Sequence, residues 1–550
     1  MKNCTNISQG LRQTAIDYPH KRAVVYPSGR DAKGRVTYSQ VTFRQLDRKS
    51  DSLAYGLERA GIIRGTRTVL MVPPSIEFFH IIFAMFKTGA VPVVVDPGMG
   101  VDRMVTCFSK GKPDAFIGIP KAHLLRKLKP RFFKSVKKWV TVGRRLFWGG
   151  HSLDSLFLEK EEPYPCARTT GNETAAVVFT TGSTGPAKGV VYTHGNFEAQ
   201  IKQIATHFDI RGDEIDLPTF PLFALFDPAL AMTAVIPDMD PTRPARANPE
   251  KIFEAVEDHG VTNMFASPAL LHRLGKYGRE KGVRLDSLRR VVSAGAPVSP
   301  ASIDQFSSIL SKEAFIHTPY GATEAVPVIS ISSDEILSDT RQLTEKGFGI
   351  CIGRPILNTG VKIIKITDEP ITQLRENHFL APGEVGEIIV NAPLVTKQYF
   401  DDRNEDTLAK IPDPSEGIWH RMGDLGWMDK KGRIWFCGRK NHRVETGSET
   451  LFTIPCESIF NNHEQVFRTA LVGAGAKGSQ IPVIFAEPVS GEIDEKTLRK
   501  ELYEIAASSP LTRDIQHIFI RKDLPVDIRH NSKIFREKLQ GAAEKLLRKK

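Results

Sequence analysis

A ten-residue loop at residues 180–189 carries the clearest chemistry in the chain. It reads TTGSTGPAKG and joins an apolar run, residues 175–179, to a second one, residues 190–192. Glycines let backbone N–H groups approach an anion closely, hydroxyl groups donate hydrogen bonds, and Lys188 adds positive charge. These features predict a phosphate site. The loop differs from the common P-loop, because Lys188 is followed by Gly189 and not by serine or threonine.

Four later positions offer side chains that suit the rest of a nucleotide. Residues 320–324, YGATE, provide an aromatic face for a base, a close backbone approach and a carboxylate able to hold magnesium. Residues 419–424, WHRMGD, end in an acid suited to a ribose diol. Arg439 and Lys533 supply cations. Each has a simpler interpretation: a core tyrosine, a capping aspartate and two ordinary surface charges.

The elements that must position these residues alternate between helical and strand patterns. This alternation predicts an α/β fold with parallel sheets, in which Gly/Pro-rich turns after strands bind ligands. One such turn is Ala294-Gly295-Ala296-Pro297. The predicted helices cover residues 43–60, residues 77–87 and a segment from 269, and the predicted strands cover residues 68–72, 91–95, 261–266 and 288–293.

At 550 residues the chain is too long for one ordinary core, so we expect two structural units. A hairpin at residues 426–437 precedes a smaller α+β pattern, with strands near residues 469–472, 483–487 and 515–520 and a helix at 495–507. We predict a large N-terminal α/β domain, residues 1–438, of packed sheets and helices. A hinge at 439–441 and a small mobile C-terminal lid, residues 442–550, follow it.

Composition narrows the class of protein. The sequence has no apolar stretch long enough to cross a bilayer, and its start, MKNCTNISQGLRQ, lacks the apolar core of a secretory signal, so the cytoplasm is the default location. The six cysteines are scattered, which argues against a zinc knuckle, a redox pair or a disulfide framework.

Positive charge is concentrated in one stretch. The net charge is +12 and the pI is near 9.3, and residues 115–153 contain no acidic residue while lysines and arginines alternate with leucines and aromatics. Such a stretch suits peripheral contact with an anionic membrane or an acidic partner. The alternative is a solvated cationic face whose aromatics belong to the core. We do not expect nucleic-acid binding, because no recognised binding module accompanies the charge.

In this order and spacing, the segments resemble the adenylate-forming superfamily of acyl-CoA synthetases, luciferases and nonribosomal adenylation domains, over nearly the whole chain. The resemblance implies ATP and Mg²⁺ as cofactors and formation of an acyl-AMP. Lys533 would bridge carboxylate and phosphate. The resemblance assigns phosphate contacts to Thr180, Thr181, Gly182, Ser183, Thr184, Gly185 and Lys188, base contacts to Gly295, Ala296, Pro297 and Tyr320 with Gly321 beside them, phosphate and magnesium contacts to Thr323 and Glu324, ribose contacts to Asp424 and Arg439, and catalysis to Lys533, Glu324 and Thr184.

Three positions depart from the usual ligase pattern. Acyl-CoA synthetases commonly carry a histidine after Pro-Leu-Phe, and here Ala224 follows Phe223. Asn441 stands at the hinge where many relatives have aspartate or lysine, and Ser532 replaces the glycine before the terminal lysine. These changes leave the adenylation residues in place and remove features of the thioester-forming arrangement.

Three strings, TFPLFALFDPAL, AVIPDMDPTRPA and LPVDIRHNSKIFREKL, resemble the olefin-biosynthesis β-lactone synthetases, often labelled fatty-acid CoA ligases. This resemblance implies adenylation of a long-chain 2-alkyl-3-hydroxy acid. The substrate's own 3-hydroxyl then closes a β-lactone and AMP leaves. It also implies a complex with neighbouring pathway enzymes. Phe223, Leu225 and Phe226 are candidates for the acyl pocket, against the alternative that they are plain core.

Two questions stay open at this point. The group that takes the hydroxyl proton is either one of three histidines near the motifs, His420, His442 and His530, or the phosphate of the activated substrate. The alternative functions are a long-chain acyl-CoA synthetase of the same fold and, in a different class, a non-catalytic nucleotide-binding or membrane-associated scaffold that uses residues 115–153.

Overall fold

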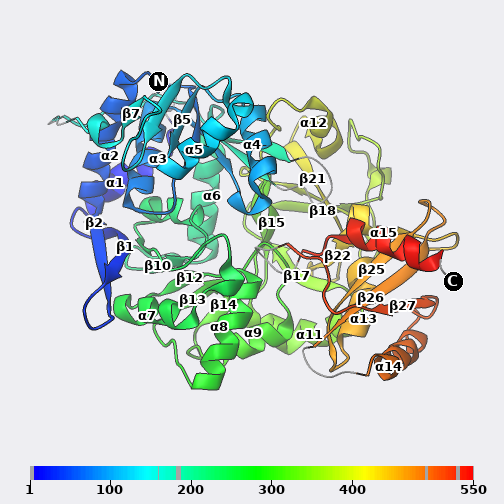
Figure 1. The fold of residues 1–550 in the computed structure, drawn as a ribbon. Coiled ribbons are helices and arrows are strands. Elements are labelled where there is room, and N and C mark those ends of the chain that lie inside the picture. Colours follow the sequence, from blue (N-terminus) through cyan, green and yellow to red (C-terminus); the bar gives the residue numbers. More distant parts are fainter. Residues whose placement is uncertain are drawn as a thin grey trace.

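The computed structural model of the chain describes residues 5–158, 160, 162–180, 187–489, 494–527 and 533–548. Within these residues the strands form two seven-stranded sheets, an eight-stranded sheet and two small sheets. Figure 1 shows the first large sheet at the top, the second below it, the third beside both, and the C-terminal elements as a separate group at the right. The α/β architecture predicted from the sequence is confirmed.

The first sheet has the strand order β7-β6-β5-β3-β4-β8-β9, and every pair is parallel except β8 with β9. The predicted strand at residues 91–95 is β4, and the helix at 77–87 is α3. The elements are α2 (Phe43–Arg59), β3 (Arg67–Met71), α3 (Ile76–Thr88), β4 (Val91–Val95), α4 (Val101–Lys110), β5 (Ala115–Gly118), α5 (Pro120–Leu128), β6 (Lys138–Thr141), β7 (His151–Ser152), β8 (Thr174–Thr180), β9 (Lys188–Thr193) and α6 (His194–His207).

The second sheet has the order β14-β13-β12-β10-β11-β1-β2 and is parallel apart from the β1–β2 pair. Helix α8 begins where the sequence predicts, because Ser267 caps its N-terminus and Pro268 fits its first turn. The elements are α1 (Ser8–Asp17), β1 (Arg22–Arg30), β2 (Val36–Thr42), β10 (Ile215–Pro218), β11 (Thr233–Val235), α7 (Pro249–His259), β12 (Asn263–Phe265), α8 (Pro268–Lys281), β13 (Arg290–Val292), α9 (Pro300–Ser307) and β14 (Phe315–His317).

The third sheet is antiparallel, in the order β15-β16-β17-β22-β21-β19-β18, with β20 on β21. It contains the predicted hairpin, β21 with β22, whose turn places Gly432 at a φ of +73° that favours glycine. The elements are β15 (Tyr320–Ala322), β16 (Ala325–Ser330), α10 (Ser333–Glu335), α11 (Arg341–Glu345), β17 (Ile350–Pro355), β18 (Gly360–Ile364), β19 (Gly386–Asn391), α12 (Arg403–Ala409), β20 (Lys410–Asp413), β21 (Gly417–Met428) and β22 (Ile434–Arg439).

The C-terminal elements form their own sheet, β25-β26-β27, and two hydrophobic clusters of their own. The predicted small α+β unit is therefore present, while its boundary at residues 439–441 stays a prediction. The elements are β23 (Val444–Glu445), β24 (Thr450–Leu451), α13 (Thr453–Asn461), β25 (Val466–Ala474), β26 (Ile481–Pro488), α14 (Glu495–Ser508), β27 (His517–Ile520) and α15 (Arg536–Leu547).

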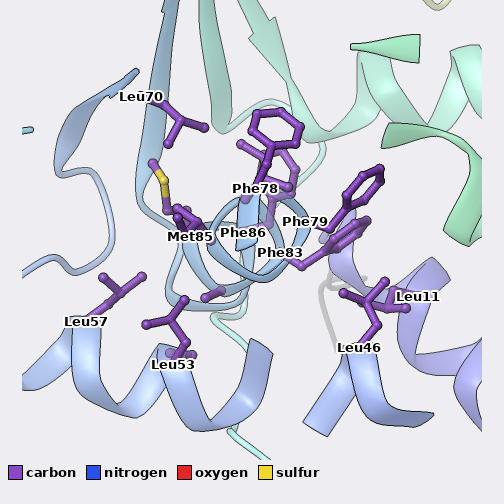
Figure 2. Close-up of a cluster of buried hydrophobic side chains, with 14 of the residues drawn as sticks. Leu11, Leu46, Leu53, Leu57, Leu70, Phe78, Phe79, Phe83, Met85 and Phe86 are labelled. Carbon is purple, nitrogen blue, oxygen red and sulfur yellow. The ribbon is translucent and has the colours of Figure 1, made fainter. Parts of the chain in front are cut away.

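Helix α3 is buried on all sides, from Phe78 to Thr88. Figure 2 shows Phe79 and Phe83 on the side that faces Leu11 of α1 and Leu46 of α2. Phe78 points away from this side, and it lines the cavity described below. Because α3 is buried on all sides, one of its faces packs against α1 and α2 and another faces the cavity, so the helix connects this part of the core to the site.

Two expectations from composition can be compared with the structure. No helix among the described residues is long and apolar enough to cross a membrane. The five cysteines in the described part, Cys107, Cys166, Cys351, Cys437 and Cys456, are free thiols, as the sequence predicts.

We expect Phe79→Ala to lower the free energy of unfolding by about 3–5 kcal/mol, because Phe79 is fully buried and its ring would leave a cavity between α2 and α3. Urea unfolding measures the change. Ile16→Ala is the control, since Ile16 of α1 is 67% exposed, and its effect should stay within about 0.5 kcal/mol. Equal effects for the two variants would contradict the placement of α3.

Candidate functional site

A cavity of about 1360 Å³ lies where the carboxyl ends of strands from the first two sheets converge. Open α/β sheets bind ligands at this edge, because the loops that follow the strands meet there. The volume exceeds the range of about 300–1,000 Å³ that is usual for a single small ligand. The lining residues at or just after strand ends are Met71 of β3, Val95 of β4, Thr180 of β8, Thr219 after β10, Phe265 of β12 and Ala294 after β13.

The predicted phosphate loop is described at its two ends. Thr180 and Lys188 both line the cavity, and the two residues face each other in the β8–β9 register. Lys188 forms an ion pair with Glu405, and its ammonium lies 5.5 Å from the ring centroid of Tyr399. The predicted phosphate ligands Thr181, Gly182, Ser183, Thr184 and Gly185 lie outside the described residues.

Glu324 lines the same cavity and is held by two neighbours. The Tyr399 hydroxyl donates to Glu324 Oε1 at 2.7 Å, and the Thr396 backbone N–H donates to the Glu324 carbonyl oxygen at 2.9 Å. Thr323 also lines the cavity, and its carbonyl oxygen accepts a hydrogen bond from the Tyr192 hydroxyl. These contacts fix Glu324 from one side only.

The donor set around Glu324 fits magnesium bound with a nucleotide. Among the described residues no group of three or more His, Cys, Asp or Glu side chains could hold a metal by itself. Mg²⁺ is usually held by one or two carboxylates together with substrate phosphates and water. Since Tyr399 donates to Oε1 alone, Oε2 of Glu324 is left to act as the single protein ligand of such an ion.

Behind Glu324 lies a buried lysine that sequence reasoning missed. Lys410 Nζ donates to the Thr396 carbonyl oxygen at 2.6 Å and lies 5.4 Å from the Tyr399 ring centroid. Burial lowers the pKa of the Lys410 ammonium to about 8, although Glu324 and Asp406 act in the opposite direction. The residues next to Lys410 in the sequence gave no signal, because its contacts with Thr396 and Tyr399 and its proximity to Glu324 depend on the folded structure.

A second group of polar residues joins Tyr320, Asp424 and Arg439. Asp424 is 3% exposed, and Tyr320 donates its hydroxyl to Asp424 Oδ2 at 2.6 Å. Arg439 Nη1 lies 3.1 Å from Oδ1, which has no hydrogen-bond donor among the described residues. Burial raises the pKa of Asp424, and Arg439 offsets part of that rise. Oδ1 is buried and Asp424 is not among the described lining residues, so the ribose contact assigned to it stays a prediction.

The structure does not bring every predicted nucleotide residue to the cavity surface. Gly295, Gly321 and Arg439 line it. Ala296, Pro297, Tyr320 and Asp424 are not among the described lining residues. Tyr320 instead holds Asp424 through its hydroxyl, so its ring is fixed beside the wall and the base contact assigned to it stays a prediction.

Lys533 reaches the cavity from the C-terminal unit. Its backbone pairs with Asp527, which donates to the Lys533 carbonyl at 3.0 Å and accepts from the Lys533 N–H at 2.9 Å through Oδ1. Three residues later, Arg536 makes a two-pronged ion pair with the buried Glu457 of α13, at 2.6 and 3.0 Å. These contacts anchor the chain on which Lys533 stands.

The predicted hinge is bound to the large unit by charge. Lys440 lies between Arg439 and Asn441, and its Nζ is 3.2 Å from Glu387 Oε1 and 3.0 Å from the Thr367 carbonyl oxygen. Lys440, Asn441 and Glu387 line the cavity. Opposite charges therefore hold the connection between the two units at the edge of the site.

The apolar part of the cavity contains the three predicted acyl-pocket residues, Phe223, Leu225 and Phe226. It also contains residues that the sequence analysis did not name. The predominantly apolar sequence of residues 76–88 was a usable signal, because a helix with apolar residues on several faces must pack against more than one part of the molecule. The additional lining residues are Phe78, Ile82 and Phe86 of α3, Met104 and Phe108 of α4, and Leu124, Leu125 and Leu128 of α5.

Of the three candidate histidines, His420 lines the cavity. Its Nδ1 lies 3.2 Å from the Ala409 carbonyl oxygen, and burial lowers its pKa well below the usual value. His442 is not among the described lining residues, and burial lowers its pKa to about 3, so its contact with Glu537 is not an ion pair near neutral pH. His530 lies outside the described residues.

Comparison with known proteins gives consistent matches. A family model described as AMP-binding enzyme matches residues 11–400. An olefin beta-lactone synthetase of Stenotrophomonas maltophilia (strain K279a) is 46% identical, with all of both chains covered. One of Xanthomonas campestris pv. campestris is 45% identical over 98% of this chain and 97% of its own. The solved structure of an O-succinylbenzoate coenzyme A synthetase from Bacillus subtilis, in complex with ATP and a magnesium ion, superposes with a TM-score of 0.75 at 20% identity, covering 96% of this chain and 98% of that one.

We expect the stability of the protein to rise between about pH 8 and pH 10.5 through Lys410. Its pKa is about 8 in the folded state, against 10.5 for a free lysine, so the unfolded chain binds more protons over this window. The full difference corresponds to about 3 kcal/mol. Urea unfolding at several pH values should show a smaller rise for Lys410→Met. Lys365→Met, at an exposed position, is the charge-matched control. Parallel pH curves for wild type and Lys410→Met would refute the assignment.

Proposed function

This chain belongs to the AMP-binding enzyme family, and we propose that it is a β-lactone synthetase of olefin biosynthesis. It activates a long-chain 2-alkyl-3-hydroxy acid with ATP and closes the lactone from the acyl-AMP. The observation that carries the proposal is the full-length identity of 46% to an olefin beta-lactone synthetase. The cavity supports it, because polar nucleotide residues and a long apolar wall line one continuous space.

The first step joins two anions, the substrate carboxylate and the α-phosphate of ATP. Lys533 and Arg439 both face this space and offset the repulsion between them. Glu324 would hold Mg²⁺, which, when bound, neutralises charge on the pyrophosphate that leaves. Because Tyr399 and Thr396 already fix Glu324, its carboxylate needs little reorganisation as the charge moves.

The second step uses a nucleophile that is already in place. The 3-hydroxyl oxygen attacks the carbonyl carbon of the acyl-AMP, the four-membered ring closes, and AMP leaves with the electrons of the acyl–phosphate bond. A hydroxyl on the same molecule needs no second binding site, since its effective concentration is high. The departing phosphate of AMP takes the hydroxyl proton. His420 is less suited to that role, because burial keeps its pKa well below the usual value.

A long-chain acyl-CoA synthetase is the second candidate within the same fold. Its support is the Pro-Leu-Phe segment, residues 221–223, which lines the cavity as expected for a ligase of this kind. Against it stands Ala224, which is buried in a short 3₁₀ turn where such ligases commonly carry a histidine. The lactone proposal accounts for an alanine in place of the histidine, since lactone formation does not require CoA thiol to enter the site.

We expect the purified chain to convert ATP and a 2-alkyl-3-hydroxy acid into a β-lactone, AMP and pyrophosphate with CoA withheld. Mass spectrometry of the products checks this. The 3-methoxy analogue is the matched substrate control: it should support ATP–pyrophosphate exchange but give no lactone, because its oxygen has no proton to lose. A CoA thioester as the main product when CoA is supplied would favour the acyl-CoA synthetase instead.

We expect Lys533→Ala to reduce adenylation by roughly two orders of magnitude or more, the scale of removing one charge-stabilising group. ATP–pyrophosphate exchange with the hydroxy acid measures this step alone. Lys538→Ala is the control, because Lys538 is an exposed lysine five positions further along that does not line the cavity. Exchange that survives in Lys533→Ala at the level of Lys538→Ala would contradict the role of Lys533, whereas a wild-type chain that catalyses no exchange would support the non-catalytic scaffold.

A further inference from the structure

The apolar end of the cavity reaches the molecular surface at α4 and α5. Val101, Leu124 and Leu128 line the cavity and are nevertheless 49%, 48% and 71% exposed. A side chain that is both lining and exposed marks an opening. Helices α4 and α5 lie next to one another in front of the first sheet (Figure 1), and Lys129, just after α5, pairs with Asp102 of α4. The cavity therefore opens between two helices with apolar outer residues.

Helix α5 separates its residues by face. Ala122, His123 and Arg126 are buried, and Trp148 stacks on His123 with ring centroids 5.3 Å apart. Leu124 and Leu128 stand one helical turn apart on the exposed side. Phe133 and Trp148 of the basic stretch thus belong to the core, as one of the two interpretations predicts, whereas Phe147 is exposed, and so are Leu124 and Leu128.

Cations surround the exposed leucines. Lys121, Lys127 and Arg131 are exposed on or just after α5. Asp102 is the sole carboxylate in the sequence of α4, and Lys129 neutralises it. Residues 115–153 contain no acidic residue at all. The opening is consequently apolar at its centre and positive at its rim.

We propose that this surface, Val101, Leu124 and Leu128 with Lys121, Lys127 and Arg131, docks on an anionic phospholipid membrane and passes the lipid substrate and product between bilayer and cavity. We name it the docking face. The identity of the lipids that pass through the opening rests on the proposed function, whereas the docking itself does not depend on it. Exposed leucines surrounded by lysine and arginine are the composition of interfacial helices, with leucines entering the headgroup boundary and cations meeting anionic lipids.

An acidic protein is the other class of partner that fits the charge. The membrane is favoured because the exposed leucines continue directly into the apolar wall of the cavity, through Leu125, Met104 and Phe108. A long-chain acid and its lactone have little solubility in water, so an opening of this kind is useful at a lipid surface. A purely electrostatic protein contact would not require Leu124 and Leu128 to be exposed.

The test is sedimentation of the full-length protein with vesicles of phosphatidylglycerol and phosphatidylcholine, compared with phosphatidylcholine alone. We expect binding to the anionic vesicles that weakens with salt. Lys127→Glu/Arg131→Glu should lower the partition coefficient about 10-fold or more, since each cation near an anionic surface contributes measurably. Leu124→Ser/Leu128→Ser should lower it at least about 5-fold.

Matched controls separate the docking face from the overall positive charge. Lys496→Glu/Lys500→Glu changes the net charge equally on α14, at exposed positions away from the cavity, and should bind vesicles as the wild type does. Leu357→Ser/Ile481→Ser replaces two exposed apolar residues elsewhere and should also bind normally. Equal losses in test and control variants overturn the proposal. Binding that the Leu124 and Leu128 changes leave intact, or no binding, also overturns it and leaves an acidic protein as the partner.

Failure of docking and failure of the proposed function are distinguishable. ATP–pyrophosphate exchange with a short, water-soluble 3-hydroxy acid reports adenylation without any membrane. Lys127→Glu/Arg131→Glu should keep this exchange, because neither residue lines the cavity. Exchange without vesicle binding would reject docking alone, and vesicle binding without exchange would reject the proposed chemistry alone.

Discussion

The contact between Asp424 and Arg439 is the interaction on which the site depends. The two residues face each other in the β21–β22 register, and Arg439 is the last residue of β22 before the chain leaves for the C-terminal unit. Tyr320, from the edge strand β15 of the same sheet, donates its hydroxyl to Asp424 Oδ2. The Asp424 carboxylate is buried while the Arg439 side chain is 36% exposed, and loss of the arginine would leave a buried charge without its partner. The pair therefore fixes Asp424 against the end of β22, from which the chain continues to the C-terminal unit that carries Lys533.

Pairing also explains how so many charges can line one cavity. Lys188 meets Glu405, Lys440 meets Glu387, and Glu324 accepts from Tyr399. A cation that is already held in place at a cavity wall can meet a phosphate with little reorganisation, which is the property that electrostatic catalysis requires. The same logic makes Lys410 unusual, because it is buried against a carbonyl oxygen and not against a carboxylate.

The sequence predicted those parts of the molecule that local patterns determine. The strand at residues 91–95, the hairpin β21–β22 and the start of α8 at Ser267 depend on alternation, a turn glycine and a cap, all of which are visible in short windows. Tyr399 and Lys410 could not be found in this way. Tyr399 contacts Glu324 and Lys410 feels its charge, and because Glu324 is more than seventy residues away, no short sequence window reveals either relationship. Helix α3 is an intermediate case: its apolar residues could be recognised in the sequence, but the cavity that they line could not.

The shape of the cavity bears on why an internal nucleophile suits this chain. One space runs from Lys533 and Glu324 to the exposed leucines of α5, with Phe223 and Leu225 on either side of the buried Ala224 along its wall. A thioester-forming enzyme must admit a large, charged thiol after the first step, whereas a 3-hydroxyl is already beside the activated carbonyl. An alanine at position 224 therefore leaves the second step unaffected, since that step admits no thiol. The apolar wall formed by Phe223, Leu225 and Phe226 stays in one continuous cavity with Glu324 and Lys533, so a nucleophile carried on the lipid itself can remain beside the activated carbonyl through both steps.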